Sequence, residues 1–267
     1  MVHRISLILM FCIFVAVVSD AVDDKCEASS AAMLQSVDIV KVVKGLIKEH
    51  DSGAWVQIGS NTMHAELLTN NPVMQVLDLI PHWNKYFMEP IPHNYDRLIE
   101  EAKKWPNSTT VQAAVSGNGG NFEGISTMYC LEGYHLENHE HHHNKKTRQS
   151  HSADELCSFD KKHVLKHFPK GQIVEVAVSC MSFRVLLTMY QVTDVRVLVV
   201  DTEGFDAAVI MALPLSEIRP PVIIYEHAHL SAGDDDQAAA QLMKHCYHLF
   251  KELDNTYAVH KDYLKLL

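Results

Sequence analysis

The sequence predicts an α/β fold in which a mostly parallel central sheet carries helices on both faces. The strongest support is residues 197–210, where an unbroken apolar run ends in Asp201, Glu203 and Gly204 and then becomes helical. Apolar residues on both faces are typical of a strand buried between two helical layers. Polar residues at the end of such a strand lie where α/β proteins bind their ligands.

Two earlier segments repeat this order of strand, turn and helix. Residues 55–61 form a short apolar strand that runs into a turn of small residues. Residues 86–92 form an aromatic strand that ends on an acid and is stopped by two prolines. Residues 94–102 then have the apolar spacing of an amphipathic helix. The chain is therefore expected to repeat one unit of strand, turn and helix.

Five short motifs follow one another along the chain. They are Gly59-Ser60-Asn61, Phe87–Pro92, Ala113–Ser116, Val200–Gly204 and Ile223–Glu226. In this order they resemble the motif series of FkbM-type methyltransferases, which use S-adenosylmethionine. The resemblance implies a Rossmann-like class I methyltransferase fold with a seven-stranded sheet, over residues 54–267. We expect residues 22–53 to form a helical lead-in before this domain.

The resemblance also indicates where S-adenosylmethionine binds. A strand that ends in a tight turn exposes N–H groups that suit the carboxylate end of this cofactor, and Gly59 lets the backbone approach closely. Glu89 is suited to accept hydrogen bonds from both ribose hydroxyls, and the alternative is an exposed acid that caps the following helix. The sequence departs from the family in two places, because Gln57 replaces the usual acid and the expected second glycine is replaced near Met63 and His64.

The later motifs supply the other expected cofactor contacts. Residues 113–116 resemble the segment that lies over the adenine, and Asp201 and Glu203 close the fourth strand beside the methyl donor. The expected cofactor-binding residues are Gly59, Ser60, Asn61, Glu89, Ala114, Ser116, Asp201 and Glu203.

Methyl transfer requires groups that align the acceptor and, for a hydroxyl acceptor, take up its proton. The candidates are Asp201, Glu226 at the end of the fifth strand, and His227 directly after it. His229 would share a face with His227 if that strand continued. The alternative for Asp201 is a cap on the helix that begins near Phe205, because aspartate is favoured at helix starts.

Composition limits the kind of partner. The 267 residues carry a formal net charge of −10, which argues against nucleic acid because phosphate binding needs clustered lysine and arginine. Small molecules, glycans and proteins remain as substrates. The resemblance implies methyl transfer, and we expect O-methylation of a hydroxylated small molecule or a glycan. The alternative is a non-catalytic binding or metal-capturing protein on the same scaffold, which the changes at Gln57 and Met63 favour. The oligomeric state does not follow from the sequence.

Residues 1–21 have the features of a secretory signal peptide. Arg4 precedes an apolar run over residues 5–18 that is short for a bilayer span, and small residues follow at 19–21. We expect a secreted or lumenal protein without a stable membrane span after cleavage, and a retained signal anchor is the alternative. Residues 107–109 form a glycosylation sequon, which matters in that compartment.

The cysteines fit an oxidising compartment. Cys130 and Cys157 lie on either side of a polar insert and are the expected disulfide. Cys180 and Cys246 lie in apolar surroundings and are expected to be buried free thiols. When Cys12 is removed with the signal an odd number remains, so at least one cysteine is free or pairs between chains.

The polar insert occupies about residues 132–156 and lacks apolar periodicity, so we expect a mobile loop. Imidazole nitrogens bind Zn²⁺ or Cu²⁺, and the loop is either solvated without a ligand or a weak metal binder. The histidine spacing is not that of a defined site, and no metal ligand is assigned. The histidines of the insert are His135, His139, His141, His142, His143 and His151.

Overall fold

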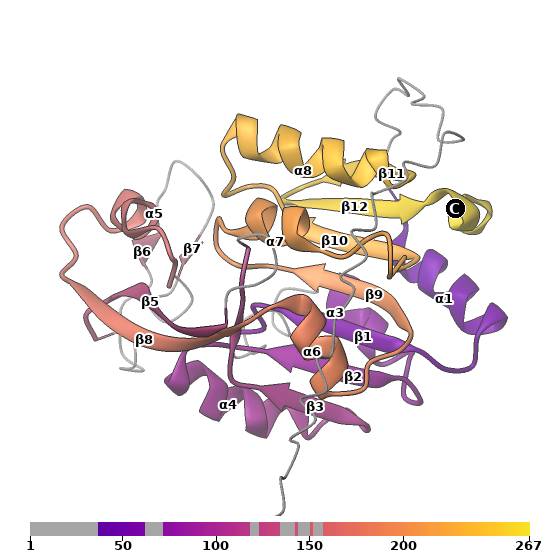
Figure 1. Cartoon of the computed structure of the whole chain (residues 1–267), viewed down its shortest axis with the longest axis horizontal. Helices are drawn as coiled ribbons and strands as arrows, with labels where there is room; N and C mark the ends of the chain where they lie inside the picture. Colours follow the sequence, from indigo (N-terminus) through magenta and orange to yellow (C-terminus); the bar gives the residue numbers. More distant parts are fainter. Residues whose placement is uncertain (1–36, 62–71, 118–122, 134–141, 144–149, 152–156) are drawn as a thin grey trace, which may run out of the picture.

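The computed structural model describes residues 37–61, 72–117, 123–133, 142–143, 150–151 and 157–267. A seven-stranded sheet in the order β11-β12-β10-β9-β1-β2-β3 runs through the centre of the chain (Figure 1). The five strands from β10 to β3 are parallel, whereas β12 is antiparallel to both of its neighbours. The strands of this sheet are β1 Ala54–Ile58, β2 Asn84–Met88, β3 Ser108–Val111, β9 Val195–Val200, β10 Val222–Glu226, β11 Tyr247–Glu252 and β12 Asn255–His260.

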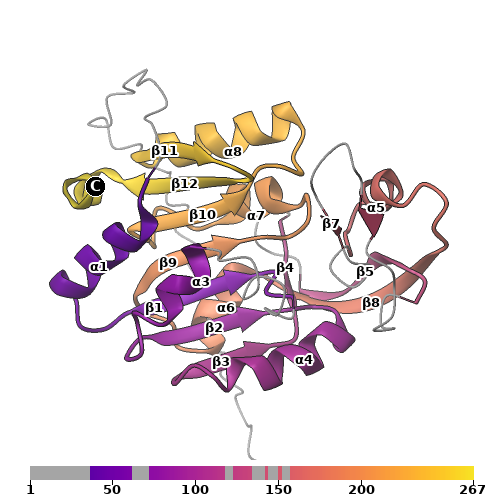
Figure 2. The ribbon, with the colours of Figure 1, turned by 180° about the vertical axis from the view of Figure 1, so that it is seen from behind.

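The central strands are apolar on both faces because helices cover the sheet from both sides. Along β1 and β2, Trp55 and Phe87 pack with one helical layer, whereas Val56 and Met88 pack with the other. Figures 1 and 2 show the two layers from opposite sides. The first layer consists of α1 Ile39–Glu49, α3 Pro72–Leu77 and α4 Pro92–Ala102, and the second of α6 Phe183–Met189, α7 Asp206–Ala212 and α8 Ala232–Lys244. The predicted α/β class, with a mostly parallel sheet between two helical layers, is confirmed.

Lys85 is a fully buried cation at the start of β2. Its Nζ donates hydrogen bonds to the carbonyl oxygens of Ile80, Trp83 and Pro106, at 2.8, 3.0 and 3.0 Å. Burial lowers the pKa of this ammonium group, and the three carbonyl oxygens compensate for part of the lost hydration. The lysine thereby fixes the turns that precede β2 and β3 at the amino ends of the strands.

A second sheet in the order β4-β8-β5 extends beyond the main sheet. It is made of β4 Ala114–Val115, β5 Gly124–Leu131 and β8 Ile173–Met181. Helix α5, Lys161–His167, packs on β5 (Figure 1). We call β5, β8 and α5 the arm.

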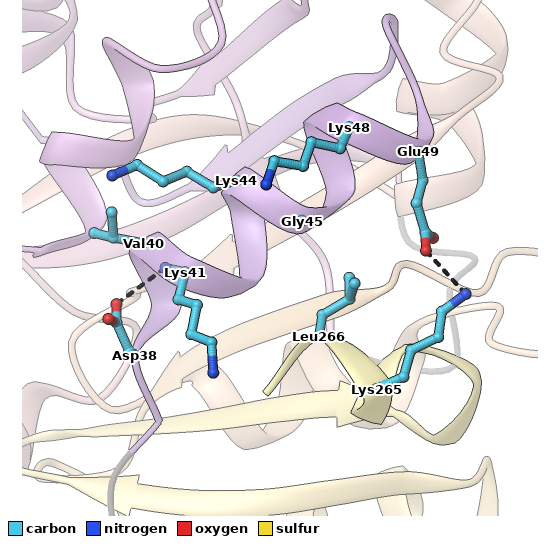
Figure 3. Close-up of a pocket in the computed structure, with 9 residues that line it drawn as sticks. All are labelled: Asp38, Val40, Lys41, Lys44, Gly45, Lys48, Glu49, Lys265 and Leu266. Atoms are coloured by element: carbon cyan, nitrogen blue, oxygen red, sulfur yellow. Dashed lines mark hydrogen bonds and ion pairs between the residues drawn. The ribbon is translucent and has the colours of Figure 1, made fainter.

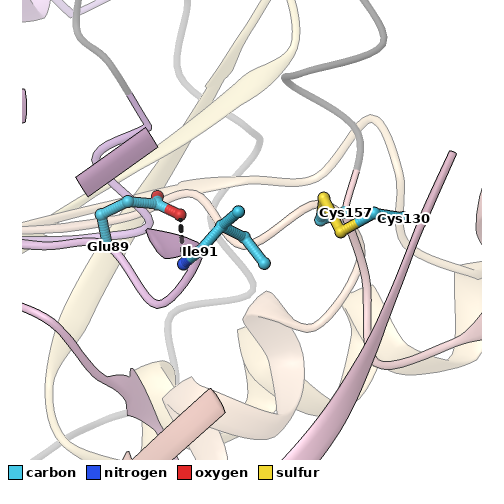
Figure 4. Close-up of a disulfide and its surroundings, with 4 residues drawn as sticks. All are labelled: Glu89, Ile91, Cys130 and Cys157. Carbon is cyan, nitrogen blue, oxygen red and sulfur yellow. Dashed lines mark hydrogen bonds between the residues drawn. A yellow bond between two sulfur atoms is a disulfide. The ribbon is translucent and has the colours of Figure 1, made fainter. Parts of the chain in front are cut away.

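A disulfide joins Cys130 on β5 to Cys157 just before α5, with a Cα–Cα distance of 4.5 Å (Figure 4). This confirms the predicted pair. Cys180 is a buried free thiol, as expected. Cys246 takes part in a disulfide, so the expectation of a free thiol there is wrong. Apolar surroundings do not distinguish a thiol from a half-buried cystine.

Within the expected His-rich insert, the structure describes a short antiparallel pair formed by β6, His142–His143, and β7, Ser150–His151. The other insert histidines, His135, His139 and His141, lie outside the described residues. The expected signal peptide and Met63 lie outside them as well. Among the described residues, none of the helices combines the length and the apolar character that a bilayer crossing requires.

At the end of the molecule opposite α5, the 3-10 helix η1, Lys261–Leu266, packs against α1. An open hollow between them is lined by the lysines at positions 41, 44, 48 and 265 (Figure 3). Lys265 forms an ion pair of 2.9 Å with Glu49. Because η1 follows β12, which is antiparallel to β10, the hollow lies at the amino ends of the parallel strands. The predicted site residues are found at the opposite, carboxyl ends.

Candidate functional site

The turns after β1 and β9 cross at very close range. Gly59 has φ of +78°, and a Cβ atom built on it would lie 1.7 Å from the carbonyl oxygen of Asp201. The amide of Asp201 donates to the carbonyl oxygen of Ile58 at 2.9 Å, which holds the two turns together. Only glycine satisfies both the dihedral angle and the contact.

Ser60 clamps the turn after β1 to β2. Its side chain is fully buried, donates to the carbonyl oxygen of Gln57 at 3.2 Å and accepts from the amide of Met88 at 3.1 Å. The amides of Gly59 and Ser60 both donate to the carbonyl oxygen of Met88. Ser60 therefore contributes to the site by shaping this turn, because its hydroxyl is already used within the protein.

Gln57, at the position of the usual family acid, is a core residue. Its side chain is 1% exposed, and its Oε1 accepts a hydrogen bond of 3.4 Å from Nε1 of Trp55. The amide thus points into the layer between the sheet and the helices. An ionised carboxylate at this depth would need a charged partner.

Glu89 is the buried acid at the end of β2, with only 4% of its surface exposed. One carboxylate oxygen accepts a hydrogen bond of 2.9 Å from the amide of Asn61. The other accepts a hydrogen bond of 2.8 Å from the amide of Ile91 (Figure 4). Burial raises the pKa of Glu89 to about 7 and the charge of Asp201 adds to this, while the two amide hydrogen bonds act in the opposite direction. The alternative of an exposed helix-capping acid is wrong.

Residues 113–116, the segment expected over the adenine, lie partly in an apolar cluster and partly beside α7. Ala114 is buried in an apolar cluster with Ile91 and the disulfide. Ser116 is also buried, and within the described part of the chain its hydroxyl has no hydrogen-bond partner. A Cβ atom on Gly117 would lie 2.6 Å from Cβ of Ala208, so this segment runs tightly against α7. The structure thus brings the Ser116 end of the motif to the acids that flank α7.

Acidic side chains gather where β9 and β10 end. The charge of Asp201 contributes to the raised pKa values of Glu89, Asp206 and Glu226, which shows that these acids share one electrostatic environment. Burial is the main cause for Glu226, followed by Asp201 and Glu203, and together they raise its pKa to about 11. Four predicted site acids, Glu89, Asp201, Glu203 and Glu226, therefore lie at the same edge of the sheet.

Asp206 is an additional buried acid that the sequence analysis missed. It accepts hydrogen bonds from the hydroxyl of Thr202 at 3.0 Å and from the amide of Thr202, and burial raises its pKa to about 8. The N-cap of α7 is Phe205, so the helix cap considered for Asp201 is taken by another residue. The available signal was an acid two positions after Gly204, where the following helix begins.

The two histidines after β10 diverge because the strand ends at Glu226. The amide of His227 donates to the carbonyl oxygen of Asp254, and its Nδ1 lies 3.1 Å from the hydroxyl of Thr256. His229 instead places Nε2 at 3.3 Å from Glu226 Oε1. The shared face considered for the histidines would require a longer strand, and His229 is the histidine that contacts the acids.

Two further histidines come from α5, of which His163 contacts an acid and His167 contacts His163 and His229. His163 Nε2 lies 3.8 Å from Glu203 Oε2, and the rings of His163 and His167 are 5.0 Å apart. The sequence did not predict their position because α5 is far from β9 and β10 along the chain. Their spacing of four residues on a short helix was the available signal.

Comparison with known protein families gives one match. The sequence profile of the methyltransferase FkbM domain matches residues 75–257, which is more than half of the chain. No curated protein matches the sequence. A precorrin-6y C5,15-methyltransferase from Geobacter metallireducens GS-15 aligns at 12% identity with a TM-score of 0.39, over 89% of this chain and 94% of that one. A fibrillarin/Nop5p complex aligns at 7% identity with a TM-score of 0.37, over 86% and 88%.

Proposed function

Because the chain belongs to the FkbM methyltransferase family, we propose that it binds S-adenosylmethionine at the carboxyl edge of its sheet and methylates an oxygen atom of a hydroxylated small molecule or glycan. The family uses S-adenosylmethionine in general, and the oxygen acceptor is the specific part of the proposal. The observation that carries it is the convergence of Glu89, Asp201 and Glu226 beside the glycine turn at Gly59.

The residues present at this edge fit the cofactor. Each carboxylate oxygen of Glu89 accepts one amide hydrogen bond from the protein, and a carboxylate oxygen has further lone pairs for a pair of ribose hydroxyls. Ser116 contributes a buried hydroxyl with unused hydrogen-bonding capacity among the described residues, as an adenine edge requires. Nearby carboxylates also favour a positively charged sulfonium.

Bound S-adenosylmethionine supplies an electrophilic methyl group, and the chain has to present an acceptor oxygen in line with it. We assign this alignment to Asp201 and Glu226, which close neighbouring strands. An alcohol acceptor must also lose its proton, and an ionised Asp201 is the group proposed to receive it. Burial and neighbouring acids favour the protonated form of Glu226, which suits it to donate a hydrogen bond to the acceptor.

Replacing Asp201 by asparagine keeps the side-chain shape and removes its charge, so methyl transfer should fall by about 100-fold or more with little change in stability. The assay measures transfer of a labelled methyl group from S-adenosylmethionine to a panel of hydroxylated small molecules and glycans. Asp236→Asn, an exposed acid on α8, is the matched control and should retain full activity.

Calorimetric titration of the wild-type chain with S-adenosylmethionine and S-adenosylhomocysteine comes first. Absence of binding at millimolar concentration of either compound would remove the enzyme proposal. The alternative, a non-catalytic binding protein on the methyltransferase scaffold, would then take its place.

We also propose that the protein works in the secretory pathway, as the signal-like residues 1–21 suggest. The Cys130–Cys157 disulfide supports an oxidising compartment, and Asn107 of the sequon is exposed. Expression in eukaryotic cells should yield a secreted or lumenal chain whose mass falls on treatment with an N-glycosidase. The Asn107→Gln variant should show no such mass change, and an unmodified cytosolic wild-type chain would contradict the assignment.

A further inference from the structure

Three histidine side chains meet at the carboxyl edge of the main sheet. His163 and His167 lie four residues apart on α5, and His229 follows β10. Their ring centroids are separated by 5.0, 5.1 and 5.2 Å, so the three imidazoles surround a common point. Histidines from α5 and from the segment after β10, which are distant along the chain, therefore lie side by side.

Carboxylates complete this group. Oε2 of Glu203 lies 3.5 Å from Nε2 of His229 and 3.8 Å from Nε2 of His163. One potential ligand atom from each of the three histidines lies within 4.8 Å of the others, and the same holds for Glu203, Glu226 and His229. A tetrahedral zinc site with bonds of ~2.0–2.1 Å sets its ligand atoms ~3.3 Å apart. Metal binding would therefore require these side chains to rotate toward one another.

Burial distinguishes this group from a solvated cluster of histidines. The side chains of His163 and His229 are 8% and 4% exposed, and Glu203 is 20% exposed. Nε2 of His163, Nε2 of His167 and Oε2 of Glu203 are shielded from solvent. Gathering imidazoles and carboxylates away from water is costly unless a cation compensates for the lost hydration.

The surrounding chain holds the group in place. The disulfide fixes the segment before α5, and the hydroxyl of Ser158 donates to the carbonyl oxygen of Glu203 at 3.1 Å. Gly204 has φ of +90°, and a Cβ atom there would lie 3.1 Å from Nδ1 of His163. The turn after β9 is thus shaped so that α5 can approach it closely.

We propose that His163, His167, His229 and Glu203 bind one divalent transition-metal ion, with Zn²⁺ as the best match to three imidazoles and a carboxylate. Neutral imidazole is a preferred ligand of Zn²⁺, and four such ligands form a closed, structural type of site. The ion docks α5 of the arm onto the turns after β9 and β10. Glu226, at 3.3 Å from His229, lies at the border between this site and the methyl-transfer site.

Titration of the metal-free full chain with Zn²⁺ tests the proposal without cofactor or acceptor, so its result is independent of the proposed methyl transfer. We expect one equivalent to bind at micromolar concentration or tighter. Because His167 is a proposed ligand at the end of α5, His167→Gln should lower the affinity for this Zn²⁺ ion by about 100-fold or more. The matched control is the triple variant of the insert, His141→Gln, His142→Gln, His143→Gln, which should bind Zn²⁺ with wild-type affinity. Tight binding that survives His167→Gln and disappears in the insert variant would overturn the proposal.

Hydrogen exchange of the wild-type chain provides a readout that needs no variant. Addition of Zn²⁺ to the chelator-treated protein should slow amide exchange in residues 161–167 at least tenfold, because the ion would fasten α5 to the sheet edge. Unchanged exchange in α5 at saturating Zn²⁺ would contradict the site, whatever the behaviour of the variants.

Discussion

Replacing Gly59 by alanine is expected to abolish binding of S-adenosylmethionine and to destabilise the fold by several kcal/mol. The residue has φ of +78°, which costs about 1 kcal/mol for a side chain with a Cβ atom. The larger effect is steric, because the new methyl group would lie 1.7 Å from the carbonyl oxygen of Asp201 and 2.7 Å from its carbonyl carbon. Both contacts are with backbone, so the strand ends of β1 and β9 would have to separate.

Thermal unfolding and calorimetric titration measure the two consequences of Gly59→Ala. Gly233→Ala is the matched control, because a Cβ atom at that helical position meets only Oγ of Ser231 at 4.0 Å. The control should bind the cofactor normally and be as stable as the wild type or slightly more stable. If Gly59→Ala bound S-adenosylmethionine with wild-type affinity, the cofactor would not bind at the turns after β1 and β9.

The second large effect is expected at Glu89. Glu89→Gln should weaken cofactor binding by roughly 2–3 kcal/mol at pH 8, as expected for the loss of charge-assisted hydrogen bonds to the ribose. The fold should survive, since the amide oxygen of glutamine can still accept from a backbone N–H. Glu100→Gln, an exposed acid on α4 whose side chain is 70% exposed, is the matched control.

Wild-type binding should also depend on pH in a defined direction. The pKa of Glu89 is raised to about 7, and the ribose contact needs the ionised form, so the acid must lose a proton on binding at lower pH. Affinity should be constant above pH 7 and fall about tenfold per pH unit below it, because each unit costs about 1.4 kcal/mol. Titrations between pH 5.5 and pH 8 should show this slope in the wild type and a flat profile in Glu89→Gln. Equal slopes would assign the pH dependence to another group.

The sequence predicted the parts of the fold that depend on local pattern. Largely apolar runs identified β1 and β9, because a strand buried on both faces needs mostly apolar residues. β10 was predicted from the resemblance of Ile223–Glu226 to a family motif. Glu89 was predicted as the acid on which an aromatic strand ends, and Glu226 as the last residue of that motif. The Cys130–Cys157 pair was predictable because its members bracket a polar insert.

What the sequence did not reveal depends on contacts between distant segments. Most of β8 alternates between exposed residues and residues that are buried or partly buried, and it pairs with β5 to form the arm. A local apolar pattern does not specify this pairing. The cluster of His163, His167 and His229 exists only once α5 is docked beside β10. The pKa of Asp206 is raised mainly by its complete burial. Acids on the first turn of a helix are common at the surface, so the sequence gives no sign of this burial.

The central position of β1 affects the order in which the chain can mature. β1 is paired with β2 on one side and with β9 on the other, and β9 lies in the last third of the sequence. The sheet therefore cannot close until most of the chain has been synthesised, and such non-local pairing is slow. Cys130 and Cys157 are only 27 positions apart, so their covalent link can form while β9 is still being made. The disulfide can thus join β5 to the segment before α5 ahead of the pairing of β9 with β1.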